Sequence, residues 1–190
     1  EDTVEAAELA KVDFCLNVVR NSGLEVVKAF AGDVKASVGE AVKLVNEVCS
    51  ISIDNRADIV LISPGGFPFD GSLFESLRCL DIAEKLVKRG KSIVLVAECA
   101  KGLGDKEFVE TISKHNDLKS LEKELKRNIN IGKLLAYRLL VAVQNTSLFL
   151  VSVVPDYLIT QVSIVKGARS ANEAFRYASE ITGKNSKVAV

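Results

Sequence analysis

Residues 58–104, DIVLISPGGFPFDGSLFESLRCLDIAEKLVKRGKSIVLVAECAKGLG, decide the fold of this 190-residue chain. Within them, an apolar run at 59–62 is followed by a Pro-Gly-Gly turn, an amphipathic segment and a second apolar run at 93–97. This order is typical of a strand–helix–strand crossover, whose two strands are parallel and buried on both faces. A right-handed crossover brings the carboxyl ends of both strands to one edge of the sheet. We therefore expect the glycine loops at 64–66 and 102–104 to lie close together, at the edge where open α/β sheets bind ligands.

The residues before this stretch predict a β-hairpin and a helix. Two β-rich runs, 12–19 and 24–31, flank Asn21-Ser22-Gly23, and Asn and Gly tolerate the left-handed geometry that a tight turn needs. Valines and alanines at spacings of three and four predict a helix that begins after Asp33 and runs past residue 48.

The later residues continue an alternation of helices and strands. The crossover helix is predicted from Ser72 to Gly90, with a buried stripe that includes Val87 and with Asp81–Lys85 and Glu84–Lys88 as surface ion pairs. The remaining predicted elements are helices at 105–114, 117–126 and 131–143, a strand at 148–154, a helical turn at 156–160, a short strand at 161–165, a helix from Ser170 to Gly183 and a last strand at 187–190. The fold class is therefore α/β: a mostly parallel sheet flanked by helices, with an N-terminal β-hairpin, in a single domain over residues 1–190.

Composition excludes several classes of protein. Apolar residues make up 48% and charged residues 26%, which is the balance of a globular protein with a core, and 25 basic residues cancel 25 acidic ones. We therefore expect no nucleic-acid partner, and no apolar run approaches the ~18–20 residues that cross a bilayer. The cysteines show no C-x-x-C spacing and are expected to be buried free thiols in a cytoplasmic protein. A chain that begins at Glu1 and contains no methionine is expected to be a piece of a longer protein.

Several residues near the expected binding edge could take part in chemistry, and each also has a structural interpretation. The glycine loops could bring backbone N–H groups to an anion or could serve as turns, since neither fits a named phosphate motif. Glu98, at the end of a strand, could face a ligand or brace a loop. Glu75 and Arg78 could form a surface ion pair or could face the cleft. His115 is predicted to lie on the surface and, as the one histidine, cannot build a histidine-rich metal site or a Ser–His–Asp triad unaided.

The segments SPGGFPFD, SLFESLRCLD and IVLVAECAKGLGDKEF occur in this order within residues 63–108. Together they resemble the C-terminal half of nickel-dependent lactate racemase and its relatives. The similarity extends back through LNVVRNSGLEVVKAFAGD and forward through LFLVSVVPD, so it covers nearly the whole chain.

This resemblance implies a two-domain enzyme with its active site between the domains. Such enzymes use a nickel pincer nucleotide, a pyridinium-derived group tethered to a lysine, to move a hydride from and to the α-carbon of a 2-hydroxy acid. The tethering lysine and the nickel-binding histidine belong to the N-terminal domain, which we expect to be the partner of this chain. The chain would then form one wall of the active site and would not be active alone.

The family places a Tyr-Gln pair and then a lysine at the start of the crossover helix, near substrate and cofactor. The matching residues here are Phe74, Glu75 and Arg78, which we predict to bind substrate, and all three depart from the family pattern. Arg78 keeps the positive charge and can hold a carboxylate through two hydrogen bonds. Glu75 places a negative charge where the family has a neutral amide, which makes lactate itself a doubtful substrate.

Four further residues are predicted to contact the cofactor: Gly65, Gly66, Glu98 and Tyr137. The three departures also favour an alternative function, a non-catalytic α/β module that binds a small molecule or regulates another domain.

Overall fold

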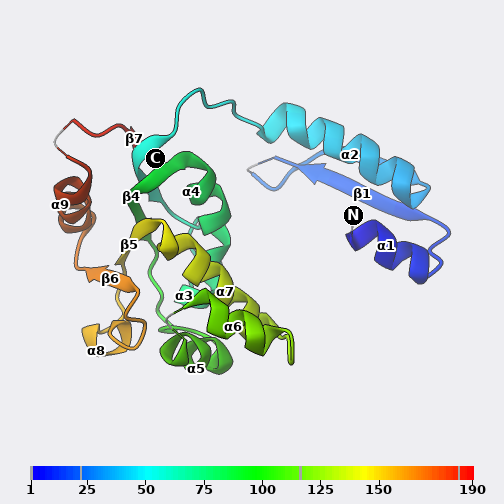
Figure 1. Ribbon diagram of the computed structural model, residues 1–190. Helices are drawn as coiled ribbons and strands as arrows, with labels where there is room; N and C mark the ends of the chain where they lie inside the picture. Colours follow the sequence, from blue (N-terminus) through cyan, green and yellow to red (C-terminus); the bar gives the residue numbers. More distant parts are fainter. Residues whose placement is uncertain (1, 22, 116, 184) are drawn as a thin grey trace. The chain divides into compact units, whose positions relative to one another are not determined.

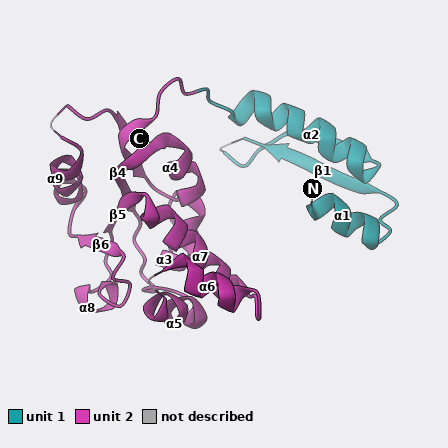
Figure 2. Ribbon diagram, viewed as in Figure 1, with its two compact units in different colours: residues 1–52 teal, residues 53–190 magenta. Residues whose placement is uncertain are grey.

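The computed structural model describes residues 2–21, 23–115, 117–183 and 185–190. The chain divides into two compact units, residues 1–52 and 53–190 (Figures 1 and 2). The sequence predicted one domain over 1–190, whereas the contacts divide the chain near residues 50–56, which contain no helix or strand.

The first unit is a two-stranded antiparallel sheet with helices. Its elements are α1 Asp2–Leu9, β1 Cys15–Arg20, β2 Val26–Gly32 and α2 Val34–Cys49. The predicted hairpin is confirmed, although Ser22 of the predicted turn lies outside the described residues. The Asp33 side chain accepts a hydrogen bond from the Ala36 N–H (2.9 Å), which begins α2 as predicted. Ser37 of α2 is buried against the hairpin, where its hydroxyl accepts a hydrogen bond from the Asn17 amide (3.1 Å).

Gly39 lies inside α2, and a Cβ atom placed on it would meet nothing within 4 Å. We expect Gly39→Ala to stabilise α2 by about 0.5–1 kcal/mol, because alanine loses less backbone entropy than glycine in a helix. Amide hydrogen exchange measured along α2 should slow by a factor of about 2–5 if this helix opens as a unit. Unchanged or faster exchange would contradict the prediction.

The second unit is built on a five-stranded sheet in the order β6-β5-β4-β3-β7, in which every described pairing is parallel. The strands are β3 Ala57–Ile62, β4 Val87–Val96, β5 Thr146–Val151, β6 Val165–Ala168 and β7 Val188–Ala189. The helices are α3 Leu73–Ser76, the 3₁₀ turn η1 Leu77–Cys79, α4 Leu80–Leu86, α5 Lys106–Lys114, α6 Leu118–Leu125, α7 Ile131–Gln144, α8 Asp156–Ile159 and α9 Ala171–Thr182. The predicted fold class, a mostly parallel sheet with helices and an N-terminal hairpin, is confirmed.

Two layers of helices enclose this sheet. Helices α4 and α7 pack on one face, over a large core that includes Leu95, Leu150 and Phe108. Helix α9 covers the other face, over a smaller core that includes Ile59 and Phe149, and Figure 1 shows it on the opposite side of the strands from α4 and α7. Burial on both faces explains why the strands read as continuous apolar runs.

The crossover helix ends earlier than predicted. It stops at Leu86, and Val87 takes an extended conformation and pairs with Ala57 at the start of β4. Lys88 is therefore on a strand and pairs with Asp58 (3.0 Å), so the predicted Glu84–Lys88 pair is wrong. The predicted Asp81–Lys85 pair is wrong as well, because Asp81 pairs with Arg138 of α7.

Two smaller predictions also need correction. The strand predicted at 161–165 forms later in the chain, as β6 Val165–Ala168. All four cysteines are free, as predicted, and Cys79 and Cys99 are buried, but Cys49 is exposed. Among the described residues, no helix has the length and apolar character needed to cross a membrane.

His115 is not a surface residue, since its side chain is only 16% exposed. Its Nδ1 and Nε2 atoms form hydrogen bonds with Ser120 (2.9 Å) and Glu124 (2.8 Å). Glu124 also pairs with the buried Lys133 (2.9 Å), and the hydrogen bonds from Lys133 and His115 lower the pKa of Glu124. This network joins α5, α6 and α7. The sequence gives no sign of it, because its members come from three separate segments.

Candidate functional site

The loops that follow β3 and β4 lie side by side at the carboxyl edge of the sheet. Four backbone hydrogen bonds join them: Cys99 N–H to Asp70 C=O (2.8 Å), Lys101 N–H to Gly71 C=O (2.8 Å), Leu73 N–H to Gly102 C=O (3.0 Å) and Phe74 N–H to Leu103 C=O (3.1 Å). The two predicted glycine loops are therefore parts of one structure. This structure holds the start of the crossover helix against the end of β4.

In the strand order, the chain adds strands first on one side of β3 and then on the other. From β3 the chain steps outward through β4 and β5 to β6, and α9 then carries it back to β7 on the other side of β3. Open α/β sheets bind ligands at such a switch point, outside the carboxyl ends of the strands. The loop at residues 63–72 follows β3 and occupies this position.

Two contacts hold the first turn of the crossover helix, residues 72–75, in place. The Ser72 hydroxyl accepts a hydrogen bond from the Glu75 N–H (3.2 Å), and Ser72 and Glu75 have the spacing of a capping box. The Phe74 ring packs edge-to-face against Phe108, with 5.6 Å between the ring centroids. Because Phe108 is fully buried, the core of the second unit anchors Phe74.

A cavity of about 490 Å³ lies beside this helical turn. It is lined by Pro68, Phe69, Phe74, Glu75, Arg78, Leu135 and Arg138. The cavity brings together the three residues predicted to bind substrate, Phe74, Glu75 and Arg78. The sequence did not single out the contribution of α7, Leu135 and Arg138, because helical periodicity gives no sign of which other segment a helix packs against.

Arg78 carries a positive charge that no carboxylate neutralises among the residues that the structure describes. Its guanidinium lies over the Phe69 ring, with 4.5 Å between the guanidinium carbon and the ring centroid. No ion pair joins it to Glu75 in the described chain, whereas the neighbouring Arg138 pairs with Asp81. The surface ion pair between Glu75 and Arg78 that the sequence left open is therefore not formed. This arrangement can bind an anion, because a stacked guanidinium presents its N–H groups at its rim.

The carboxylate of Glu75 turns back toward the start of the helix. Its Oε2 atom is buried without a hydrogen-bond partner and lies 2.6 Å from where a Cβ atom on Gly71 would be. Asp70, the residue before Gly71, also has a buried Oδ1 atom without a hydrogen-bond partner. Glu75 therefore adds negative charge to the cavity wall while at least one of its oxygens faces the backbone.

The four residues predicted to contact a cofactor lie outside the residues that line this cavity. Gly65 and Gly66 form the turn after β3 with φ of +99° and +79°. Glu98 is exposed; its N–H donates to Asp70 Oδ2 (3.4 Å) and its carbonyl accepts from the Val153 N–H (3.0 Å). The Tyr137 hydroxyl donates to Glu122 (3.1 Å), and this hydrogen bond raises the pKa of Tyr137. Their role toward a cofactor stays a prediction.

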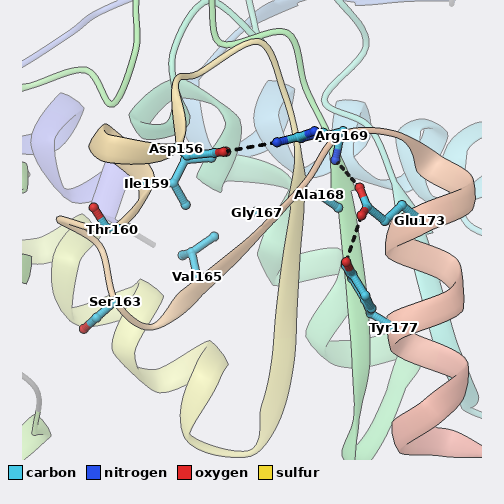
Figure 3. Close-up of a pocket in the computed structure, with 10 residues that line it drawn as sticks. All are labelled: Asp156, Ile159, Thr160, Ser163, Val165, Gly167, Ala168, Arg169, Glu173 and Tyr177. Atoms are coloured by element: carbon cyan, nitrogen blue, oxygen red, sulfur yellow. Dashed lines mark hydrogen bonds and ion pairs between the residues drawn. The ribbon is translucent and has the colours of Figure 1, made fainter.

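A larger cavity, of about 580 Å³, lies between β6, α8 and α9 (Figure 3). Its charged side chains are already engaged with one another. Glu173 accepts hydrogen bonds from the Arg169 N–H and the Tyr177 hydroxyl (2.8 Å each), and Arg169 pairs with Asp156 at 3.9 Å. This cavity therefore offers a ligand less uncompensated charge than the one beside Arg78.

The donor groups of the described residues do not fit a nickel site. No group of three or more histidine, cysteine, aspartate or glutamate side chains that could hold a metal ion occurs in this part of the chain. Burial raises the pKa of the Cys99 thiol to about 11, so that this cysteine keeps its proton at neutral pH and is a poor metal ligand.

Comparison with known proteins identifies one relative over the whole chain and a second over part of it. The lactate racemase of Thermoanaerobacterium thermosaccharolyticum is 29% identical over 197 aligned residues, which cover 100% of this chain and 45% of the relative. The lactate racemase of Lactiplantibacillus plantarum is 32% identical over 120 residues, which cover 63% of this chain and 28% of the relative. The chain thus spans less than half the length of these curated relatives.

Solved structures agree with this relationship. The lactate racemase apoprotein from T. thermosaccharolyticum superposes with a TM-score of 0.90 at 28% identity, over 100% of this chain and 46% of that one. A Thermotoga maritima protein from a structural genomics programme shares the fold, with a TM-score of 0.62 at 13% identity over 98% of this chain and 50% of that one. The model of the lactate racemase C-terminal domain family matches residues 53–190. This match covers the whole second unit and more than half of the chain, which therefore belongs to the lactate racemase C-terminal domain family.

Proposed function

We propose that this chain is the substrate-binding wall of a 2-hydroxy acid racemase or epimerase. The observation that carries the proposal is Arg78, a guanidinium that lines the cavity at the switch point of the sheet without an ion-pair partner among the described residues. A 2-hydroxy acid always carries a carboxylate, and an arginine fork is the side chain whose geometry best matches it.

In this proposal Arg78 fixes the carboxylate and Phe69 fixes Arg78. Stacking on the Phe69 ring limits the rotation of the guanidinium, so that less rotamer freedom is lost when the carboxylate binds. Phe74, anchored on Phe108, forms part of the wall of the same cavity. A substrate held by its carboxylate presents its α-carbon in a constant direction, which is what a reaction at that carbon requires.

The family resemblance implies a nickel pincer nucleotide, which would supply the hydride acceptor when bound. The side chains described here do not fit the metal itself, so we propose that its ligands and the lysine tether belong to the N-terminal domain of the whole protein. Gly65, Gly66, Glu98 and Tyr137 are proposed to contact the organic part of this group. The chain alone is expected to be inactive.

The test is an activity assay on the full-length protein, produced together with the enzymes that make the cofactor. We expect conversion of one enantiomer of a 2-hydroxy acid into the other, measured by chiral chromatography across a panel of acids. A protein that carries nickel but converts none of them would overturn the enzymatic proposal and leave the non-catalytic binding module.

A further inference from the structure

We infer that the preferred substrate has an apolar side chain larger than the methyl group of lactate. This inference rests on the proposed function and concerns the same cavity. In the bound acid, the carboxylate lies on Arg78 and the side chain lies against the wall formed by Phe74 and Leu135.

The lining of the cavity supports this assignment. Pro68, Phe69, Phe74 and Leu135 supply an apolar surface, and the remaining residues are Glu75, Arg78 and Arg138. Arg138 is paired with Asp81, and Glu75 Oε2 is buried against Gly71. Arg78 is thus left as the anion anchor, and most of the surface around it is apolar.

The size of the cavity also favours a substrate with a large side chain. Its volume of about 490 Å³ leaves room on this wall for more than a three-carbon acid. A small acid on Arg78 would leave the Phe74–Leu135 wall in contact with water. A larger apolar side chain would cover that wall and gain affinity in proportion to the apolar area removed from water.

The wall is also preformed. Phe74 packs edge-to-face on the fully buried Phe108, and Phe74 and Leu135 both pack against the core of the second unit. The Phe69 ring is occupied by Arg78, so the substrate side chain contacts Phe74 and Leu135 instead. A rigid apolar wall beside a single anion anchor selects ligands by the size of their apolar part.

The experiment uses two carboxylates that cannot react, because they lack the 2-hydroxyl group: propionate and 3-phenylpropionate. Each is titrated into the ¹⁵N-labelled full chain, and the Arg78 Nε–H signal and the backbone amides of residues 74 and 135 are followed by NMR. We expect both acids to shift the Arg78 signal and 3-phenylpropionate to bind about tenfold more tightly or better. It should also shift the amides of residues 74 and 135.

Two variants of α7 distinguish the loss of a contact with the ligand from a general effect on folding. Leu135→Ala should weaken the binding of 3-phenylpropionate severalfold and leave that of propionate unchanged. Leu134→Ala, at a neighbouring residue that is 41% exposed and does not line the cavity, should change neither.

The outcomes distinguish this inference from the proposed function. If both acids shift the Arg78 signal and bind with equal affinity, the preference for a large side chain is wrong and the carboxylate site stands. If neither acid shifts Arg78, the carboxylate site fails and the inference fails with it.

Discussion

Replacing Arg78 with alanine is expected to weaken carboxylate binding by about 10- to 100-fold. Hydrogen bonds to a charged group contribute roughly 1.5–3 kcal/mol each to stability, and the variant would lose those that the guanidinium donates. In the full-length enzyme the same change should lower kcat/KM by at least this factor, because a carboxylate that is not fixed no longer orients the α-carbon. NMR titration of the chain with propionate measures the first effect, and the racemisation assay measures the second.

Two companion variants show whether charge or geometry is responsible. Arg78→Lys keeps the charge but loses the planar fork and its stacking on Phe69, so its affinity should lie between those of the wild type and Arg78→Ala. Glu75→Gln removes the negative charge from the cavity and still suits its capping-box position, so carboxylates should bind a few-fold more tightly. Because Arg78 is exposed, Arg78→Ala should fold normally. Wild-type affinity in the Arg78→Ala variant would remove Arg78 from the site.

The sequence was sufficient to predict the features of the fold that depend on local pattern. Apolar runs of strand length with glycine turns after them predicted β3 and β4, and the handedness of crossovers then placed both glycine loops at one edge. The four hydrogen bonds between those loops confirm that placement. Phe74, Glu75 and Arg78 were found by resemblance to a family. They line one cavity because they lie within little more than one helical turn, and that turn begins at this edge.

Features that depend on contacts between distant segments could not be predicted in this way. Val87 fits the apolar stripe of a helix as well as a buried strand, and its pairing with Ala57 decides between the two. Leu135 and Arg138 complete the cavity, but only the packing of α7 against the crossover helix brings them there. His115 looked exposed because its neighbours in sequence are polar, whereas its hydrogen-bond partners Ser120 and Glu124 come from the next helix.

Replacing Gly104 with alanine is expected to destabilise the second unit by about 2–6 kcal/mol. Gly104 has φ of +98°, and strain at such a backbone conformation costs an L-residue about 1–3 kcal/mol. A Cβ atom there would also lie 2.5 Å from Phe74 Cβ and 2.7 Å from Ser72 Oγ. Overpacking of this kind costs a further ~1–3 kcal/mol, because these atoms sit next to the backbone and cannot move aside alone. Urea denaturation followed by NMR signals of β3 and β4 would measure the loss; the chain has no tryptophan for fluorescence.

The matched control is Gly102→Ala in the same loop. Gly102 has a similar φ of +75°, but a Cβ atom there would meet only Leu158 Cδ1, at the ordinary contact distance of 3.9 Å. Gly102→Ala therefore isolates backbone strain and should cost about 1–3 kcal/mol, less than Gly104→Ala. The extra loss at Gly104 should come with weaker propionate binding, because displaced Ser72 and Phe74 carry the helical turn that holds Arg78. Equal destabilisation by the two variants would show that close packing of the glycine loops does not hold the site together.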